Sequence, residues 1–263
     1  MPPEKISACV ITFNEERKIG RCLRSLTWCD ELIVVDSFST DRTADICREF
    51  TSRVYQREWL GYVGQRNTVR EMAQHPWILF LDADEEVSPG LREEIRAEFA
   101  RGHGGTVGYE FPRQVYYLGR WIRHGEWYPD LKLRLFRKDC GRTEGQEPHD
   151  KVVVSGGRIQ RLKNAIWHYT YDDLRDHFET LNRFSTITAQ QKFVQGSRFQ
   201  WRDLLCRPPL RFLRGYFLRA GFLDGAHGFV IALASAYGAY MKYAKLWELT
   251  QRERKPYRDL PEG

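Results

Sequence analysis

The chain has 263 residues, 42% of them hydrophobic and 29% charged, which is the composition of an ordinary globular protein. Its six cysteines form no Cys-x-x-Cys pair, which argues against a zinc ribbon or a redox pair. The N-terminus has no basic stretch followed by an apolar one, so a signal peptide is not expected. We therefore expect a cytoplasmic protein.

The first hundred residues predict strands and helices in alternation. Strands are expected at 6–12, 32–35, 52–55 and 77–81, helices at 15–26, 41–50 and 62–74, and a further helix after Ser88. This order predicts a parallel, doubly wound sheet. After the glycines at 102–105 the pattern predicts antiparallel or edge strands at 106–118 and 131–138, and helix again from about Tyr171.

An acidic cluster directly follows the apolar run 77–81. The run predicts a strand buried on both faces, and Asp82, Asp84, Glu85 and Glu86 come where that strand leaves the sheet. Ligands of open α/β sheets bind at the carboxyl ends of strands. Two carboxylates one residue apart can hold a divalent cation that recruits phosphate oxygens, so this strand end predicts a nucleotide diphosphate site; the alternative is an ordinary acidic loop.

Two earlier strands also end in polar residues. Thr12-Phe13-Asn14-Glu15-Glu16 follows the first strand, and Asp36-Ser37-Phe38-Ser39-Thr40-Asp41 follows the second. Asn14 and Asp41 are also good helix caps, but three polar strand ends together are harder to explain as caps. The spacing predicts that all three lie at one edge of the sheet.

With these motifs the chain resembles the family 2 glycosyltransferases. The matching residues are 10–16, 34–43, Gly64-Gln65-Arg66-Asn67 and 81–85. The resemblance implies a GT-A fold, a mixed α/β sheet flanked by helices, with a C-terminal helical extension. It implies a catalytic domain over 1–170 and an extension over 171–263. It also implies that the donor nucleotide is contacted by Thr12, Asn14, Glu15, Asp36, Arg66, Asp82 and Ala83.

Further motifs resemble a subgroup that includes bacterial lipopolysaccharide inner-core β-glucosyltransferases. They are Gly125-Glu126-Trp127-Tyr128-Pro129-Asp130, residues 133–137, Pro148-His149-Asp150-Lys151-Val152 and residues 211–225. The resemblance implies a nucleotide-sugar donor such as a UDP-hexose, a lipid-linked acceptor such as lipopolysaccharide core, and Mn²⁺ or Mg²⁺. Asp150 stands where this subgroup more often has Glu.

An inverting transfer requires a base for the acceptor hydroxyl and a cation for the leaving diphosphate. Asp150 is the first candidate for the base and Asp130 the second; the alternative for Asp150 is a salt bridge to Lys151 or an arginine. The metal ligands are expected to be Asp84, Asp82 and His168, with His149 as another candidate. The alternative for either histidine is a hydrogen-bonded structural role.

Arginines and aromatic residues give further candidate contacts. Arg134 and Arg137 are expected on the same side of the strand at 131–138, where they could clamp phosphates. Trp121, Trp127 and Tyr128 could stack on a sugar ring. The alternatives are an ordinary solvated strand face and loop packing.

The net charge of +6 is concentrated near the C-terminus. Residues 192–222 carry seven basic residues and one acid, so this segment alone accounts for the net charge. Pro208 and Pro209 are expected to interrupt a helix, after which Phe212, Tyr216 and Ala220 line one side of a basic amphipathic helix. The uncharged run 229–241 is too short to span a bilayer, for which about 20 residues are needed. We expect peripheral binding to an anionic membrane on its cytoplasmic face, and no nucleic-acid binding.

Three other classes of protein fit the sequence less well. A sugar-phosphate nucleotidyltransferase would need a Gly-rich, basic first loop, whereas the loop at 12–16 is acidic and has no glycine. A dinucleotide oxidoreductase would need G-x-G-x-x-G after the first strand, and this motif is absent there. A non-catalytic nucleotide-binding scaffold at a membrane stays possible, although Asp82, Asp84 and Asp150 argue against it.

Overall fold

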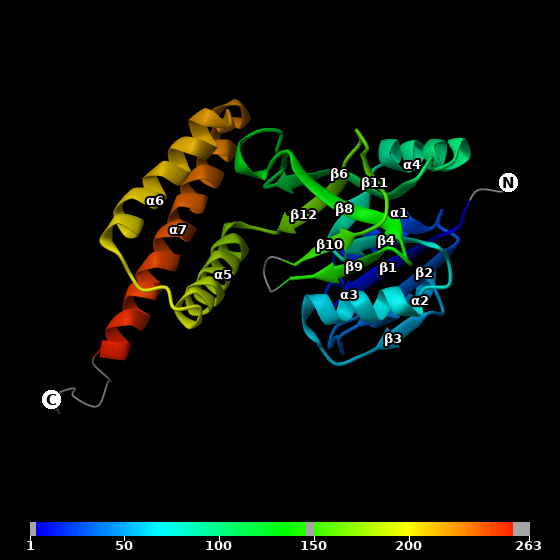
Figure 1. Ribbon diagram of the computed structural model, residues 1–263, viewed down its shortest axis with the longest axis horizontal. Helices are drawn as coiled ribbons and strands as arrows, with labels where there is room; N and C mark the ends of the chain where they lie inside the picture. The colour runs from blue at the N-terminus through cyan, green and yellow to red at the C-terminus, as the bar shows by residue number, and fades with distance from the viewer. Residues whose placement is uncertain (1–3, 146–149, 255–263) are drawn as a thin grey trace. The chain divides into compact units, whose positions relative to one another are not determined.

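The computed structural model describes residues 4–145 and 150–254. Its contacts divide the chain into two compact units (Figure 1). The α/β unit consists of the described residues of Met1–Tyr116 and Pro129–Thr170, and the helical unit of those of Tyr117–Tyr128 and Tyr171–Gly263. The functional division at residue 170 stays a prediction.

The N-terminal half of the α/β unit is parallel. Its strands lie in the order β3-β2-β1-β4, and all three pairings are parallel. They are β1 (Ile6–Thr12), β2 (Glu31–Asp36), β3 (Val54–Gln56) and β4 (Trp77–Asp82), connected by α1 (Ile19–Leu26), α2 (Thr43–Phe50) and α3 (Gly61–Met72). All of these elements were predicted, although α1 begins four residues later than expected, after a turn in which Asn14 adopts φ 53°.

The sheet continues beyond β4 with strands of mixed direction. β8 (Asp130–Arg137) is antiparallel to β4 and to β6 (Thr106–Tyr117). The order continues with β12 (Ile166–Tyr171) and β5 (Glu85–Val87), which are antiparallel to each other. The other elements of this half are α4 (Pro89–Arg101), β11 (Arg158–Arg161) beside β6, and the pair β9 (Gly141–Glu144) and β10 (Lys151–Val154). The sheet is therefore mixed.

Side chains of β1 and β4 are buried on both faces of the sheet, as the apolar runs predicted. Ala8 and Val10 belong to one hydrophobic core with residues of α1 and α4, whereas Cys9 and Ile11 belong to a second core with Val69 of α3. Helices thus cover both faces, and only the strand ends are available for a ligand.

The helical unit is built on α5 (Leu174–Val194), α6 (Trp201–Leu213) and α7 (Gly225–Arg254). Ala189 of α5 packs with Tyr243 and Leu246 of α7 in its core. A π-helical turn, η2 (Arg214–Leu218), and a 3₁₀ turn, η3 (Gly221–Asp224), connect α6 to α7. The unit also contains β7 (Arg120–Trp121) and η1 (Gly125–Trp127).

The prolines of the helical unit do not act as predicted. Pro208 and Pro209 lie inside α6, which continues to Leu213. Their missing N–H groups leave the carbonyls four residues earlier without the usual helical donor, but do not end the helix. The regular helix ends at the π turn, so the expected amphipathic helix is not continuous.

Within the described residues, no single helix is both long enough and apolar enough to cross a membrane. Trp201–Leu218 and Gly221–Glu253 meet that test only as a pair, with a bend of 71° between them.

Candidate active site

The three polar strand ends meet at one edge of the sheet. β1 lies between β2 and β4, and its last residues Thr12 and Ile11 pair with Asp36 and Asp82. The sequence predicted this arrangement. It brings Asp36, Thr12 and Asp82 onto three adjacent strands.

The loops after β1 and β2 are tied together by hydrogen bonds. The backbone N–H of Thr40 donates to Oδ1 of Asn14 (2.8 Å), and that of Asn14 donates to Oγ of Ser39 (2.8 Å). The backbone N–H of Ser39 donates to Oδ2 of the fully buried Asp36 (3.0 Å). The backbone N–H of Glu15 donates to Oγ1 of Thr43 (2.7 Å). The predicted donor contacts Asn14, Glu15 and Asp36 thus belong to one rigid loop pair.

Two buried oxygen atoms nearby lack hydrogen-bond partners among the described residues. They are Oγ1 of Thr12 and Oε1 of Gln65, whose Nε2 donates to Oγ of Ser37 (2.9 Å). Buried polar atoms are normally paired. Their position beside the strand ends suits a polar ligand.

A network of ion-paired arginines and carboxylates surrounds Asp82 at the end of β4. Asp82 accepts from Nη2 of Arg66 (2.6 Å) and from Nη2 of Arg134 (2.5 Å). Arg134 also donates to the completely buried carboxylate of Glu85 (3.1 Å), and the other end of Arg66 pairs with Asp150. Asp82 therefore has both oxygens engaged by guanidinium groups.

This network of arginines and carboxylates extends to Asp130, the second candidate for the base. Nη2 of Arg113 lies 2.7 Å from Oδ2 of Asp130, and its Nη1 lies 3.4 Å from Glu85. Nζ of Lys132 lies 3.1 Å from Oδ1 of Asp130. Both candidate bases, Asp150 and Asp130, are therefore ion-paired here.

The ion pairs lower the pKa of two of these carboxylates, Asp82 and Asp130. Burial alone would raise the pKa of Asp82, but the charges of Arg134 and Arg66 outweigh it and hold the pKa well below its usual value. Burial also favours neutral Asp130, yet Arg113 and Lys132 lower its pKa. Burial lowers the pKa of Lys132, and the charge of Arg113 adds to that effect.

Asp84 and His168 face each other. Nε2 of His168 lies 3.1 Å from Oδ2 of Asp84, and the backbone N–H of Tyr169 donates to the Asp84 carbonyl (3.0 Å). Burial opposes the charge on Asp84, but His168 outweighs it and lowers the pKa of Asp84. Within the described residues, Nδ1 of His168 is buried without a hydrogen-bond partner. Two of the predicted metal ligands are thus neighbours.

These two residues suit a divalent cation that is also held by a substrate. Among residues 4–145 and 150–254, no group of three or more His, Cys, Asp or Glu side chains is placed to hold a metal ion. Mg²⁺ sites of nucleotide enzymes typically use one or two carboxylates, with phosphate oxygens and water as the remaining ligands. Asp84 with His168 matches that pattern better than Asp82, and Ala83, which is buried between the two carboxylates, offers only backbone atoms.

Sequence reasoning misplaced one arginine and missed two residues. Arg134 and Arg137 do not share a face, because residues three apart on a strand point to opposite sides; Arg137 pairs with Asp139 instead. Glu85 and Arg113 were not singled out, although Glu85 is the buried anchor of Arg134 and Arg113. The nearest signal was the position of Glu85 in the acidic cluster after β4.

The remaining sequence candidates fall elsewhere. His149 lies outside the described residues. Trp127 packs against Tyr117, Tyr171 and His177 in the helical unit, with ring centroids 5.1–5.9 Å apart, which is the loop-packing alternative.

A family model described as glycosyl transferase family 2 matches residues 7–170, the span that contains the strand ends, Asp84 and His168. The chain belongs to glycosyl transferase family 2. It is therefore a glycosyltransferase, and the matches favour this class over the others considered from the sequence.

Relatives of this glycosyltransferase match it over nearly its whole length. "Lipopolysaccharide core biosynthesis glycosyltransferase LpsC" of Rhizobium meliloti (strain 1021) is 30% identical, with 97% of each chain covered. An uncharacterized glycosyltransferase, RT0209, of Rickettsia typhi is 32% identical, with 95% of this chain and 89% of the relative covered.

A solved structure supports the same fold. The mannosyltransferase PcManGT from Pyrobaculum calidifontis, solved in complex with GDP-Man and Mn²⁺, superposes with a TM-score of 0.52. It is 14% identical, with 94% of this chain and 88% of that chain covered. The GT-A fold and the C-terminal helical region predicted from the sequence are confirmed.

Proposed function

We propose that this glycosyltransferase moves a hexosyl group, with inversion, from a nucleotide-diphosphate sugar such as a UDP-hexose to a lipid-linked saccharide of the lipopolysaccharide-core type. The observation that carries the proposal is the edge of the sheet where Thr12, Asp36 and the Asp84–His168 pair meet. The printed function of the LpsC relative supports the acceptor class.

The donor nucleotide would lie against the loops after β1 and β2. In this proposal the two buried, unpartnered oxygens, Oγ1 of Thr12 and Oε1 of Gln65, would accept hydrogen bonds from its base or ribose hydroxyls. Asp36 orders the loop through its hydrogen bond from Ser39. In this proposal Arg66 and Asp82 adjoin the diphosphate side of the donor.

Asp84 and His168 would hold a divalent cation, Mn²⁺ or Mg²⁺, at the diphosphate. When bound, such a cation neutralises charge on the leaving group. The lowered pKa of Asp84 keeps it ionised and able to ligate at neutral pH. The neighbour solved with GDP-Man and Mn²⁺ supports a donor and metal of this class.

The transfer itself would be one displacement. The acceptor hydroxyl oxygen bonds to the anomeric carbon as the bond from that carbon to the diphosphate breaks, and the hydroxyl proton passes to a carboxylate. Asp150 is the first choice for that carboxylate, next to Arg66 and Asp82 in the same network of arginines and carboxylates. Asp130 is the second choice.

Asp150→Asn tests the base. Asn keeps the shape of Asp150 but cannot take the proton, so transfer is expected to fall about 10²–10⁴-fold with donor affinity retained. Product formation and donor binding are measured separately. Asp139→Asn, which affects an exposed pair with Arg137, is the control and should leave both unchanged.

Asp130→Asn is the competing variant. If it removes turnover while Asp150→Asn does not, Asp130 is the base and the Asp150–Arg66 pair is a structural salt bridge.

The place of action in this proposal is the cytoplasmic face of the inner membrane, where the enzyme binds peripherally to anionic lipid. The basic segment 192–222 supports a negatively charged surface as the partner. Nucleic acid is not a partner in this proposal.

A further inference from the structure

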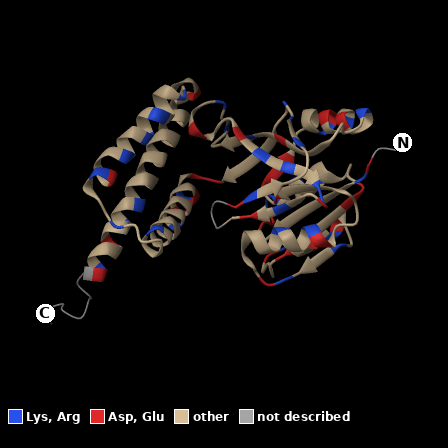
Figure 2. Cartoon of the chain, viewed as in Figure 1, with Lys and Arg blue, Asp and Glu red and all other residues tan. Residues whose placement is uncertain are grey.

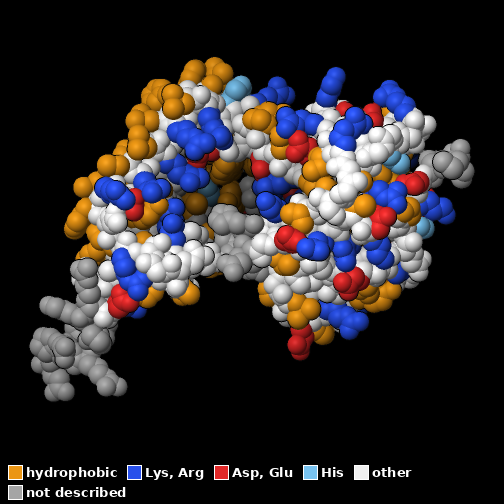
Figure 3. All heavy atoms as spheres, in the orientation of Figure 1, with side chains coloured by type: hydrophobic (Ala, Val, Ile, Leu, Met, Phe, Trp, Pro, Cys, Tyr) orange, Lys and Arg blue, Asp and Glu red, His pale blue; other side chains and the backbone are white. Residues whose placement is uncertain are grey.

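The connection between α6 and α7 exposes large apolar side chains. We define the hairpin tip as residues 210–229, which include η2, η3 and the adjoining ends of α6 and α7. Leu218 is 82% exposed and Phe217 53%. The other exposed large apolar residues of the tip are Leu210, Leu213, Phe222, Leu223 and Phe229. Figure 3 shows hydrophobic side chains gathered over α6 and α7. A contiguous surface of this kind marks an interaction site.

Glycines allow the backbone segments of the tip to pack closely against one another. A Cβ on Gly228 would lie 1.8 Å from the Gly221 carbonyl oxygen, and one on Gly221 would lie 2.6 Å from that of Gly215. Ala220 adopts φ 55°, a left-handed conformation that is strained for a residue with a side chain. The tip is therefore a closely packed turn with a defined backbone conformation.

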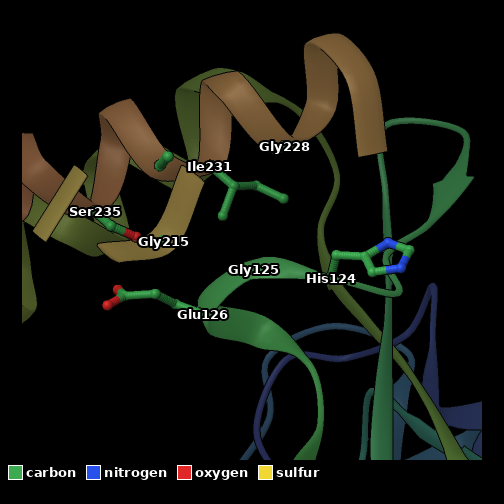
Figure 4. Close-up of a pocket in the computed structure, with 8 residues that line it drawn as sticks. His124, Gly125, Glu126, Gly215, Gly228, Ile231 and Ser235 are labelled. Carbon is green, nitrogen blue, oxygen red and sulfur yellow. The ribbon is translucent and has the colours of Figure 1, made fainter. Parts of the chain in front are cut away.

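The loop 123–126 holds the tip from below (Figure 4). The buried carboxylate of Asp224 accepts the backbone N–H groups of Arg123 (3.0 Å) and His124 (2.8 Å). The backbone N–H of Gly125 donates to the Arg219 carbonyl (2.9 Å), and Glu126 pairs with Arg211 (2.9 Å). Figure 4 shows this loop beside Gly215 and Gly228 at a small pocket.

Ring contacts join the exposed residues of the tip into one surface. Phe229 packs on Phe212 (ring centroids 5.7 Å apart) and on Tyr216 (5.6 Å). Tyr216 also contacts Phe217 (5.1 Å) and Phe222 (6.3 Å). The aromatic cluster thus spans the end of α6, both turns and the start of α7.

An apolar stripe continues the surface along α7. Phe229, Leu233, Tyr237, Tyr240 and Trp247 are exposed at intervals of four, four, three and seven residues, which places them on one side of the helix. From Gly225 to Trp247 the exposed positions carry no charge, whereas Nζ of Lys245 donates to Asn182 and Ser185. Tyr and Trp are the residues that favour a membrane interface.

Basic residues flank this surface. Arg214 and Arg219 are exposed and form no ion pair among the described residues. The blue bands along α6 in Figure 2 belong to the segment with a net charge of +6. A second copy of this chain would bring like charges together, whereas an anionic lipid surface would neutralise them.

We infer that the hairpin tip inserts into one leaflet of an anionic bilayer, with α7 lying along its surface. This inference deepens the proposed function and depends on it only for the reason why the enzyme visits a membrane. The bend of 71° between Trp201–Leu218 and Gly221–Glu253 suits a shallow, re-entrant wedge. Leu218 and Phe217 enter the acyl region, and Arg214 and Arg219 contact headgroup phosphates.

Flotation of the full chain with vesicles tests the wedge. Wild type is expected to float with vesicles of phosphatidylglycerol and phosphatidylcholine in equal parts, and far less with phosphatidylcholine alone. Leu218→Ser is expected to weaken binding about tenfold, because one large apolar side chain no longer enters the bilayer. Val194→Ser is the matched control, since Val194 is 85% exposed in the same unit but outside the tip.

A second variant separates charge from apolar insertion. Replacing Arg214 and Arg219 with Gln is expected to weaken binding about fivefold for each arginine at low salt. Equal binding of wild type, the Leu218 variant and the arginine variant would overturn the inference. So would a Val194→Ser loss as large as that of Leu218→Ser.

Two further measurements distinguish insertion into a bilayer from self-association. An environment-sensitive fluorophore on Leu223→Cys, an exposed position inside the tip, in a background with Cys140→Ser and Cys206→Ser, should shift to the blue on anionic vesicles; no shift would overturn insertion. Sedimentation should show a monomer in both wild type and Leu218→Ser. A wild-type dimer that Leu218→Ser dissociates, without vesicle binding, would instead assign the surface to a second copy.

Activity on a soluble saccharide acceptor distinguishes this inference from the proposed function. Leu218→Ser should retain full transfer to an acceptor without lipid. Vesicle binding in a protein that transfers no sugar would leave the wedge standing and remove the proposed function. If the protein transfers sugar but its vesicle binding does not depend on the tip, the proposed function stands and the inference about the tip is wrong.

Discussion

In the α/β unit charged side chains lie inside, whereas in the helical unit apolar side chains lie outside. Glu85 and Arg134 are almost completely buried, and each is compensated by an opposite charge. Leu218 and Phe217 are exposed on a backbone that glycine packing holds in place. Buried charge is costly and exposed apolar area is unfavourable in water, so each unit departs from an ordinary fold where a ligand or surface is expected.

The two units also differ in how strongly their folding depends on these side chains. Asp82 depends on two arginines from distant parts of the chain, and substitution of Arg134 removes one cation from both Asp82 and Glu85. The side chain of Leu218 in the tip is 82% exposed and has little buried area to lose on substitution. Substitution should therefore destabilise the α/β unit and leave the fold of the helical unit intact.

Arg134→Met should give the largest effect on stability. It leaves Asp82 and Glu85 without their shared cation, and breaking such a buried pair costs about 3–5 kcal/mol. The free energy of unfolding, measured by denaturant titration, should fall by that amount. Arg161→Met, which breaks an exposed pair with Glu110, is the control and should cost no more than about 1 kcal/mol. Equal losses would show that the network carries no special weight.

Acid should loosen the helical unit first. His177 is buried against Tyr117, whose hydroxyl lies 2.8 Å from Nδ1, and burial lowers the pKa of His177 to about 4. Below its unfolded pKa of about 6.5 the unfolded chain takes up a proton that the folded chain refuses, so stability falls with pH down to about 4, by up to about 3 kcal/mol.

The carboxylates of the α/β unit titrate in a lower window. The pKa of Asp82 and of Asp84 is lowered in the folded state, so their contribution is present above about 3.9 and is lost below it. Hydrogen-exchange protection, corrected for the intrinsic rate at each pH, should therefore fall in α5 before it falls in β4 as the pH is lowered from 6.5 to 4. His177→Gln should remove that difference. Simultaneous loss of protection in both elements would contradict the comparison.

The sequence was informative where structure is local. The apolar runs of β1, β2 and β4 and the polar residues after them predicted the sheet edge, because period and turn residues act over a few positions. The three-residue strand β5 has no apolar run, and its pairing with β12 is what brings His168 to Asp84. Such a contact depends on long-range pairing that no local pattern specifies.

The helical unit shows the same limit. The concentration of positive charge was visible in the sequence. The helix α6, however, was expected to break at Pro208 and Pro209, which lie inside it. The exposed surface could not be predicted, because a stripe such as Phe229, Leu233 and Tyr237 has the same spacing whether it faces a core or solvent. Burial of the opposite side of α7 against α5 decides between them.

The most direct test of the account is the release of nucleoside diphosphate from a panel of nucleotide sugars, with Mn²⁺, with Mg²⁺ and with EDTA. Wild type should release product from one donor class only when a divalent ion is present. Asp84→Ala should reduce that release on the order of a thousandfold with the fold intact, while Asp45→Ala, at an exposed pair with Arg48, should not change it. Full release by Asp84→Ala, or release that EDTA does not affect, would contradict a metal-assisted nucleotide-sugar site at this edge of the sheet.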